Sequence, residues 1–191
     1  MDLRRNPGGL LDQVQDVADE FLPSGVVLVE EFGSGRQNVY KSTDSGLAED
    51  IPMVVLIDEG SASAAEVLAG AIRDRDRGIL MGTTSFGKGT IQSVNSLSTG
   101  GGLRMTIARW LTPDENWVHE KGLQPDIVIT LPEDLSTLAE GEDPQLQAAE
   151  DYLLGKPVES MEETSAEAVA PTDAGDAVDA QPTTAADAPQ P

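Results

Sequence analysis

Two side chains form a possible catalytic pair: Ser63 in the segment EGSASAAE (59–66) and Lys88 in the segment SFGKGTIQ (85–92). The chain has one histidine, His119, and no cysteine. The chain therefore offers almost no residues for a Ser–His or Cys–His catalytic pair. A serine activated by a lysine is the arrangement that the composition still allows.

The neighbourhood of Ser63 fits two uses of its hydroxyl group. Ser63-Ala64-Ala65-Glu66 matches a capping box, and serines of this kind are usually only structural. The same position follows a buried strand and begins a helix, so the serine would be presented on a tight turn, where the Ala64 N–H can stabilise an oxyanion. If Ser63 is the nucleophile, Ser61 could cap the helix instead.

Lys88 lies between two glycines, which permit an unusual turn and a close backbone approach. An exposed loop lysine is the ordinary alternative. A lysine that acts as a base must be neutral, and removal from water favours the neutral amine. Phe86 and Ile91 are compatible with such surroundings. Gln92 could hold the amine by a hydrogen bond, although it also fits an ordinary strand position.

The same segment offers a rival of another class, a phosphate-binding loop. Residues 82–88 nearly match the pattern G-x-x-x-x-G-K-[ST], but Gly89 replaces the hydroxyl that would bind Mg²⁺. The residues after Lys88 are typical of a strand, not of the helix whose N-terminus would hold phosphate. Nucleotide binding is therefore the least favoured hypothesis.

The remaining candidates favour structural roles. Asp58 and Glu59 could form a carboxylate site, but we expect solvated acids at the end of a strand. His119 has no second histidine to join it in a zinc site. Trp110 and Trp117 are expected to pack in the core or a loop. We therefore expect no cofactor and no metal.

Charge and composition exclude several classes of function. The chain has 12 Lys and Arg against 34 Asp and Glu, a formal net charge of −22, which argues against nucleic acid or anionic lipid as a partner. Without cysteine there are no disulfides and no thiolate metal sites. No stretch is long and apolar enough to insert into a membrane, and the N-terminus shows no signal peptide.

The chain divides into a folded part and an acidic tail. After Lys156 no Lys or Arg occurs, while acids continue among Ala, Pro, Thr and Ser. Such a composition cannot bury enough apolar surface to offset chain entropy. We expect one domain of residues 1–155 and a disordered tail of residues 156–191. Because residues 2–5 look like the exit of a strand, we also expect the chain to lack its natural N-terminal part.

Apolar periodicity predicts the elements that position these residues. Helices are expected over residues 10–22, 63–74 and 144–155, and strands over residues 26–32, 37–42, 52–58, 78–82, 90–97, 102–112 and 126–131. The apolar run 52–58 is typical of a strand buried in a parallel sheet, and the alternation of helices with strands indicates an α/β core. Alternation at Leu103, Met105 and Ile107 suggests one buried face.

In this order the segments resemble the catalytic part of the carboxyl-terminal processing proteases, which are tail-specific serine endopeptidases of the S41 family. EGSASAAEVLAGAIRD (59–74) and GTTSFGKGTIQ (82–92) are similar to the catalytic segment of that family. DLRRNPGGLL (2–11) resembles its turn and helix after a sheet strand, and residues 103–129 resemble its downstream strands. The resemblance covers most of residues 2–131.

The resemblance implies roles for individual residues. Ser63 would be the nucleophile, Lys88 the general base and Gln92 the residue that orients the lysine. Lys88 would take the Ser63 proton, the alkoxide would attack a peptide carbonyl, and water would release the acyl-enzyme. The substrates would be proteins or peptides that are cleaved near their C-termini.

The resemblance also implies an oxyanion hole and a fold. The hole would use the N–H of Ala64 and a backbone N–H of Gly8 or Gly9. The fold would be a crotonase-like or ClpP-like α/β protease core, with a mixed sheet, flanking helices and additional strands.

Several features common in the family are not recognisable in this sequence. Family members usually carry an export signal, an N-terminal helical segment, a PDZ domain that binds the substrate tail, and earlier core strands. We therefore expect an N-terminally incomplete core with weak or no activity by itself. The alternative is an inert scaffold of the same family. The discriminating observation is whether the Ser63 hydroxyl and the Lys88 amine lie within hydrogen-bond reach near residues 8–9.

Overall fold

The computed structural model describes residues 1–132 and 134–160. Most of the predicted acidic tail therefore lies outside the described residues. The elements in chain order are α1 (Leu11–Phe21), β1 (Gly25–Phe32), β2 (Gln37–Ser42), β3 (Val54–Ile57), α2 (Ala64–Asp74), β4 (Ile79–Gly82), β5 (Thr90–Ser96), β6 (Gly102–Leu111), β7 (Ile127–Val128), a 3-10 turn (Leu135–Thr137) and α3 (Pro144–Leu153).

A small parallel sheet lies at the centre of the molecule. Its strand order is β3-β4-β7, and all four residues of β3 are buried, as the apolar run of residues 52–58 predicts. The N-terminal segment extends this sheet, because Asp2 forms a parallel bridge with Leu56 and the Leu3 N–H donates to the Leu56 carbonyl over 2.9 Å. Residues 2–5 thus leave the edge of the sheet and enter the turn that follows.

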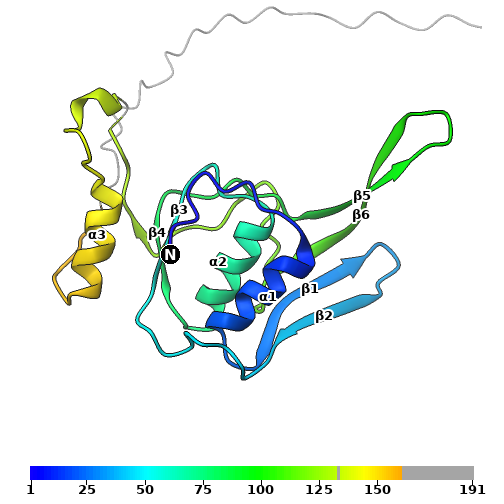
Figure 1. Cartoon of the computed structure of the whole chain (residues 1–191), viewed down its shortest axis with the longest axis horizontal. Coiled ribbons are helices and arrows are strands. Elements are labelled where there is room, and N and C mark those ends of the chain that lie inside the picture. The colour runs from blue at the N-terminus through cyan, green and yellow to red at the C-terminus, as the bar shows by residue number, and fades with distance from the viewer. Residues whose placement is uncertain (133, 161–191) are drawn as a thin grey trace, which may run out of the picture.

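Helix α2 is the main covering element of the core. It contacts β1 of one sheet, β4 of the other and helix α1 (Figure 1). Its residues 65–72 are all buried, whereas α1 buries only Val14 and Ala18 and exposes its other face. Burial on nearly all sides explains why α2 consists mostly of alanine, valine, leucine and isoleucine.

A second sheet is antiparallel and has the strand order β2-β1-β6-β5. The end of the β5–β6 hairpin projects from the body of the molecule, as Figure 1 shows. The predicted α/β class and the predicted strands are confirmed, and parallel and antiparallel pairing are found in separate sheets. The strand predicted over residues 126–131 is shorter in the structure. Because β4 ends at Gly82, β7 has no further residue of β4 to pair with beyond Val128.

The prediction of a buried face at Leu103, Met105 and Ile107 was wrong. These side chains are 43%, 45% and 40% exposed, whereas Ala108 and Trp110 face the core. The alternation is real, but the apolar residues lie on the outer face, since the outer half of β6 extends beyond the core. Among the described residues, no helix is long and apolar enough to cross a membrane.

Candidate active site

Ser63 occupies a sharp turn between β3 and α2. Its backbone has φ 56° and ψ −117°, a conformation that side-chain-bearing residues rarely adopt. Strain of this kind costs roughly 1–3 kcal/mol and persists where the surrounding structure enforces it, often at functional sites. The turn presents the half-buried Ser63 at the carboxyl end of a strand and the N-terminus of a helix, as a nucleophile requires.

Glu66 joins the Ser63 turn to the Lys88 loop. Its side chain is completely buried, and its Oε2 accepts hydrogen bonds of 2.8 Å from both the Ser63 N–H and the Lys88 N–H. The two backbone nitrogens therefore lie no more than twice that distance apart. The other carboxylate oxygen, Oε1, accepts from the Ser85 hydroxyl (2.6 Å) and the Gly87 N–H (2.7 Å).

The role of Glu66 was missed by sequence reasoning, which saw it only as the second member of a capping box. The Glu66 half of that box is formed, because the Glu66 carboxylate accepts from the Ser63 N–H, whereas the Ser63 hydroxyl makes no capping hydrogen bond to the described residues of α2. A charged residue among the apolar residues of a buried helix was the signal that could have revealed more, because a buried carboxylate needs several donors. Here those donors come from both the Ser63 turn and the Lys88 loop.

Three side chains contact the carbonyl groups of the Lys88 loop. The Trp110 indole donates to the carbonyl of Lys88 and the Trp117 indole to that of Gly89, both over 2.9 Å. His119 Nδ1 lies 3.2 Å from the Gly87 carbonyl oxygen. The prediction that the tryptophans pack in the core or a loop is confirmed for Trp110, which is 2% exposed, whereas Trp117 is 42% exposed. The indole N–H groups of both residues fix the loop backbone.

The turn at residues 6–9 approaches the Ser63 turn closely. The Ala62 N–H donates to the Asn6 carbonyl over 2.9 Å. Gly8 has φ +91°, and a Cβ on it would lie 2.5 Å from the Ala62 carbonyl oxygen and 2.7 Å from the Ala64 nitrogen. Only glycine fits there, so the backbone of Gly8 lies directly beside the serine.

The two candidate glycines differ in the use of their N–H groups. The Gly8 N–H donates to Asn6 Oδ1 over 2.9 Å. Among the described residues, no hydrogen bond engages the N–H of Gly9 or of Ala64. These two donors are therefore available to an incoming carbonyl oxygen.

Among the described residues, the side chains of the predicted pair are not joined to each other by a hydrogen bond. In the described part of the chain, no hydrogen bond joins the Ser63 hydroxyl to Lys88 Nζ, and none joins Gln92 to Lys88. Gln92 is exposed on β5, and Phe86 is 64% exposed. Lys88 itself is half-buried, as is Ile91, so of the two neighbours considered only Ile91 has the burial that would fit a partly desolvated amine.

Two further predictions near the serine were wrong. Ser61 does not cap α2: its hydroxyl donates to the Leu3 carbonyl (2.7 Å) and accepts from the Asp58 N–H (2.9 Å). Asp58 is not a solvated acid, because it is buried and its Oδ1 accepts from the N–H groups of Arg5 and Gly60. Both side chains fix the turn that leads to Ser63.

The structural context does not support a phosphate-binding loop. After Lys88 the chain continues into strand β5 at Thr90, as the sequence predicts, instead of forming a helix. The described residues include no cluster of three or more His, Cys, Asp or Glu side chains that could hold a metal ion.

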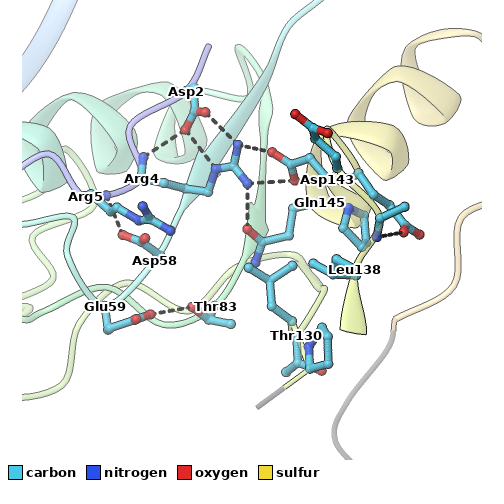
Figure 2. A pocket seen from close by; sticks show the side chains of 16 residues that line it. Asp2, Arg4, Arg5, Asp58, Glu59, Thr83, Thr130, Leu138, Asp143 and Gln145 are labelled. Atoms are coloured by element: carbon cyan, nitrogen blue, oxygen red, sulfur yellow. Dashed lines mark hydrogen bonds and ion pairs between the residues drawn. The ribbon is translucent and has the colours of Figure 1, made fainter. Parts of the chain in front are cut away.

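A separate cleft lies between the N-terminal segment and α3. Its volume is about 930 Å³, and neither Ser63 nor Lys88 lines it. Figure 2 shows the Arg4 guanidinium between the carboxylates of Asp2 and Asp143, each at 2.7 Å. Arg4 also donates to Gln145 over 3.0 Å, and Gln145 donates to the Ile129 carbonyl. This cluster links α3 to the segment that precedes the glycine turn.

The guanidinium of Arg4 changes the titration of its partners. Its hydrogen bonds lower the pKa of Asp2 and of Asp143 below their ordinary values, against the opposing effect of partial burial. The two carboxylates in turn raise the pKa of Arg4. All three groups are therefore charged at neutral pH.

Comparison with known proteins places the chain in a family. Residues 1–129 match the family model of peptidase family S41. The carboxyl-terminal-processing protease of Synechocystis sp. is 42% identical over 158 residues, which cover 81% of this chain and 36% of that protein. A probable CtpA-like serine protease of Staphylococcus aureus (strain N315) is 40% identical over 134 residues, covering 69% of this chain and 27% of that protein.

A solved structure agrees with the sequence comparisons. The photosystem II D1 C-terminal processing protease superposes with a TM-score of 0.64 at 38% identity, covering 71% of this chain and 36% of that one. The chain belongs to peptidase family S41. It spans about a third of the length of these relatives.

Proposed function

We propose that this chain carries the catalytic dyad of a serine endopeptidase that cleaves proteins near their C-termini, with Ser63 as nucleophile and Lys88 as general base. The observation that carries the proposal is the shared Glu66 carboxylate, whose Oε2 binds the N–H groups of both residues over 2.8 Å. Two segments far apart in the sequence are thereby held at one point.

The chemistry follows from these positions. The neutral Lys88 amine takes the Ser63 hydroxyl proton as the serine oxygen attacks a peptide carbonyl. The oxyanion is stabilised by the N–H groups of Ala64 and Gly9, at the positive end of helix α2. The C–N bond then breaks, and the Lys88 ammonium protonates the leaving amine. Lys88 next takes a proton from water, which hydrolyses the acyl-enzyme.

The absence of a hydrogen bond between the two side chains is compatible with this role, because catalytic hydrogen bonds often form only in the substrate complex. In that complex Gln92, four residues beyond the lysine, would orient the amine. Replacement of Gln92 by alanine should then lower kcat more than it raises KM.

The test is hydrolysis of an unstructured peptide by this chain, followed by mass spectrometry. Because this chain by itself is expected to be weakly active at most, Ser63→Ala and Lys88→Ala should each abolish the residual cleavage that the parent chain shows. Matched controls are Ser96→Ala and Lys121→Ala, which remove an exposed serine and an exposed lysine. Undiminished cleavage by either dyad variant would overturn the assignment.

A second readout separates the dyad from the inert alternative. A fluorophosphonate should attach to Ser63 Oγ in the parent chain, and the label should be lost in Lys88→Ala. A parent chain that neither cleaves peptides nor accepts the label would be an inert scaffold of the same family.

A further inference from the structure

A second groove lies beside the Lys88 loop, where strands β1, β5 and β6 of the antiparallel sheet meet the loop that carries Trp117 and His119. Its volume is about 710 Å³, and its lining includes Phe32 of β1, Thr90 of β5, Ile107 of β6, and Trp117 and His119. Trp117 and Ile107 are 42% and 40% exposed. We propose that this groove binds an apolar side chain of the peptide substrate.

The groove is attached to the catalytic loop by hydrogen bonds. Trp117 Nε1 donates to the Gly89 carbonyl, and His119 Nδ1 lies 3.2 Å from the Gly87 carbonyl oxygen. The two rings lie together, with centroids 5.2 Å apart. Thr90 is only two residues beyond Lys88. A side chain bound here therefore contacts the residues that hold the proposed base in place.

The chemistry of the lining selects an apolar occupant. The charged groups in the groove are Glu31 and Arg109, which form an ion pair of 2.5 Å, and the Arg109 guanidinium lies 5.4 Å from the Trp117 ring centroid. Their charges compensate each other, and the Arg36 guanidinium lies 4.0 Å from the centroid of the Phe32 ring. The groove therefore lacks the excess of negative charge that the chain as a whole carries, a formal net charge of −22. The exposed rings and the Ile107 side chain lose unfavourable contact with water when an apolar group covers them.

The apolar surface continues outward from the groove along β6. Met105 and Leu103 follow Ile107 at alternate positions and are 45% and 43% exposed. From Gly89 to Ile107 the sequence has one charged residue, Arg104, and no acidic residue. An extended peptide with an apolar side chain in the groove can thus lie along a surface without acidic groups, away from the acidic remainder of the molecule.

Binding can be tested without catalysis, because the chain has two tryptophans of opposite exposure. Trp110 is 2% exposed, so a change in fluorescence on binding reports mainly Trp117. We expect the Ser63→Ala variant to shift its emission to shorter wavelength when titrated with an unstructured peptide that contains leucine. The same peptide with aspartate at that position should give no shift, and Trp117→Phe should abolish the leucine response.

Specificity can be tested in the active chain, and this part rests on the proposed endopeptidase function. Ile107→Ser should lower the ratio of kcat/KM between the leucine and aspartate peptides by about tenfold, the usual effect of losing one apolar contact. The matched control is Val39→Ser. Val39 is an exposed apolar residue of the same sheet that lies outside the groove, and its replacement should leave the ratio at the parent value.

The outcomes separate this inference from the proposed function. Hydrolysis that depends on Ser63 but not on the leucine, with no leucine-specific emission shift, would contradict the proposed binding of an apolar side chain in the groove. The assignment of Ser63 and Lys88 would be unaffected. Leucine-specific binding by a chain that does not hydrolyse peptides would support the groove and contradict the proposed activity. An emission shift that depends on protein concentration alone, and disappears in Ile107→Ser, would identify a second copy as the occupant and overturn the inference.

Discussion

The Ser63–Lys88 junction and the β5–β6 hairpin are joined through Gly89, yet they are built in opposite ways. At the junction, backbone groups of three loops are held by buried side chains, of which Glu66 accepts four hydrogen bonds. Along the hairpin, the side chains of residues 94–107 are all exposed, and only strand pairing between β5 and β6 orders it.

This contrast shows where the molecule uses polar and apolar contacts. The junction fixes the relative positions of the Ser63 and Lys88 backbones through buried hydrogen bonds, which lose most of their value if one partner is removed. The hairpin carries apolar groups that contribute little to folding and are free to contact another molecule. Substitutions in the two regions should therefore differ strongly in their effect on stability.

The largest effect is expected at Glu66. In Glu66→Gln an amide NH₂ replaces one carboxylate oxygen, so two buried donors lose their acceptor. We expect the free energy of unfolding to fall by about 3–5 kcal/mol, with loss of peptide hydrolysis. Urea denaturation followed by circular dichroism measures the stability. Glu140→Gln, at an exposed glutamate, is the control, and an equal loss in both variants would contradict the role of Glu66.

The next largest loss of stability is expected at Gly8, and its neighbour Gly9 serves as the comparison. Gly8→Ala places a Cβ within 2.7 Å of the Ala64 nitrogen at φ +91°, whereas a Cβ on Gly9 meets nothing within 4 Å. We expect Gly8→Ala to cost about 2–4 kcal/mol of stability and to lower peptide hydrolysis. Gly9→Ala should change stability by less than about 1 kcal/mol. Similar melting temperatures for the two variants would show that the close approach at Gly8 does not exist in solution.

A smaller effect, dependent on pH, is expected at Asp143. Because Arg4 lowers the pKa of Asp143 in the folded state, the ion pair stabilises the fold above the unfolded pKa of about 3.9 and ceases to do so as the pH falls through the folded value. Asp143→Asn keeps an acceptor for the N-terminus of α3. It should cost about 1 kcal/mol at pH 7 and nothing near pH 2. Asp50→Asn is the exposed control, and a pH-independent difference would contradict the ion pair.

The smallest effect is expected on the outer face of β6. Met105→Ser and Leu103→Ser remove exposed apolar groups, so each should change the free energy of unfolding by less than about 0.5 kcal/mol. Thermal unfolding measures this directly. A loss of 2 kcal/mol or more would mean that this face is covered in solution, and the contrast between the junction and the hairpin would fail.

Sequence patterns predicted the elements well because local periodicity reports burial. The uninterrupted apolar run at residues 52–58 and the helical spacing at residues 10–22 correspond directly to β3 and α1. The pattern failed at Leu103, Met105 and Ile107, since alternation predicts which residues share a face but not whether another element covers that face.

For the candidate site, too, the sequence predicted the residue types but not the contacts between distant residues. A chain with one histidine and no cysteine has few nucleophile–base pairs available, and the resemblance to the S41 family then singled out Ser63 and Lys88 as the candidates. Hydrogen-bond partners distant in sequence were beyond such reasoning: Ser61 could not be assigned to the Leu3 carbonyl, nor Asp58 to the N–H of Arg5.

The sequence by itself determined the α/β elements, the glycine turns and the identity of the two candidate catalytic residues, because these depend on local conformation and chemical type. Only the tertiary structure decided that one buried carboxylate, Glu66, holds both residues together, and that the groove lined by Trp117 lies beside the Lys88 loop. A buried charge must find its donors wherever the fold brings N–H groups together, and local sequence does not contain that information.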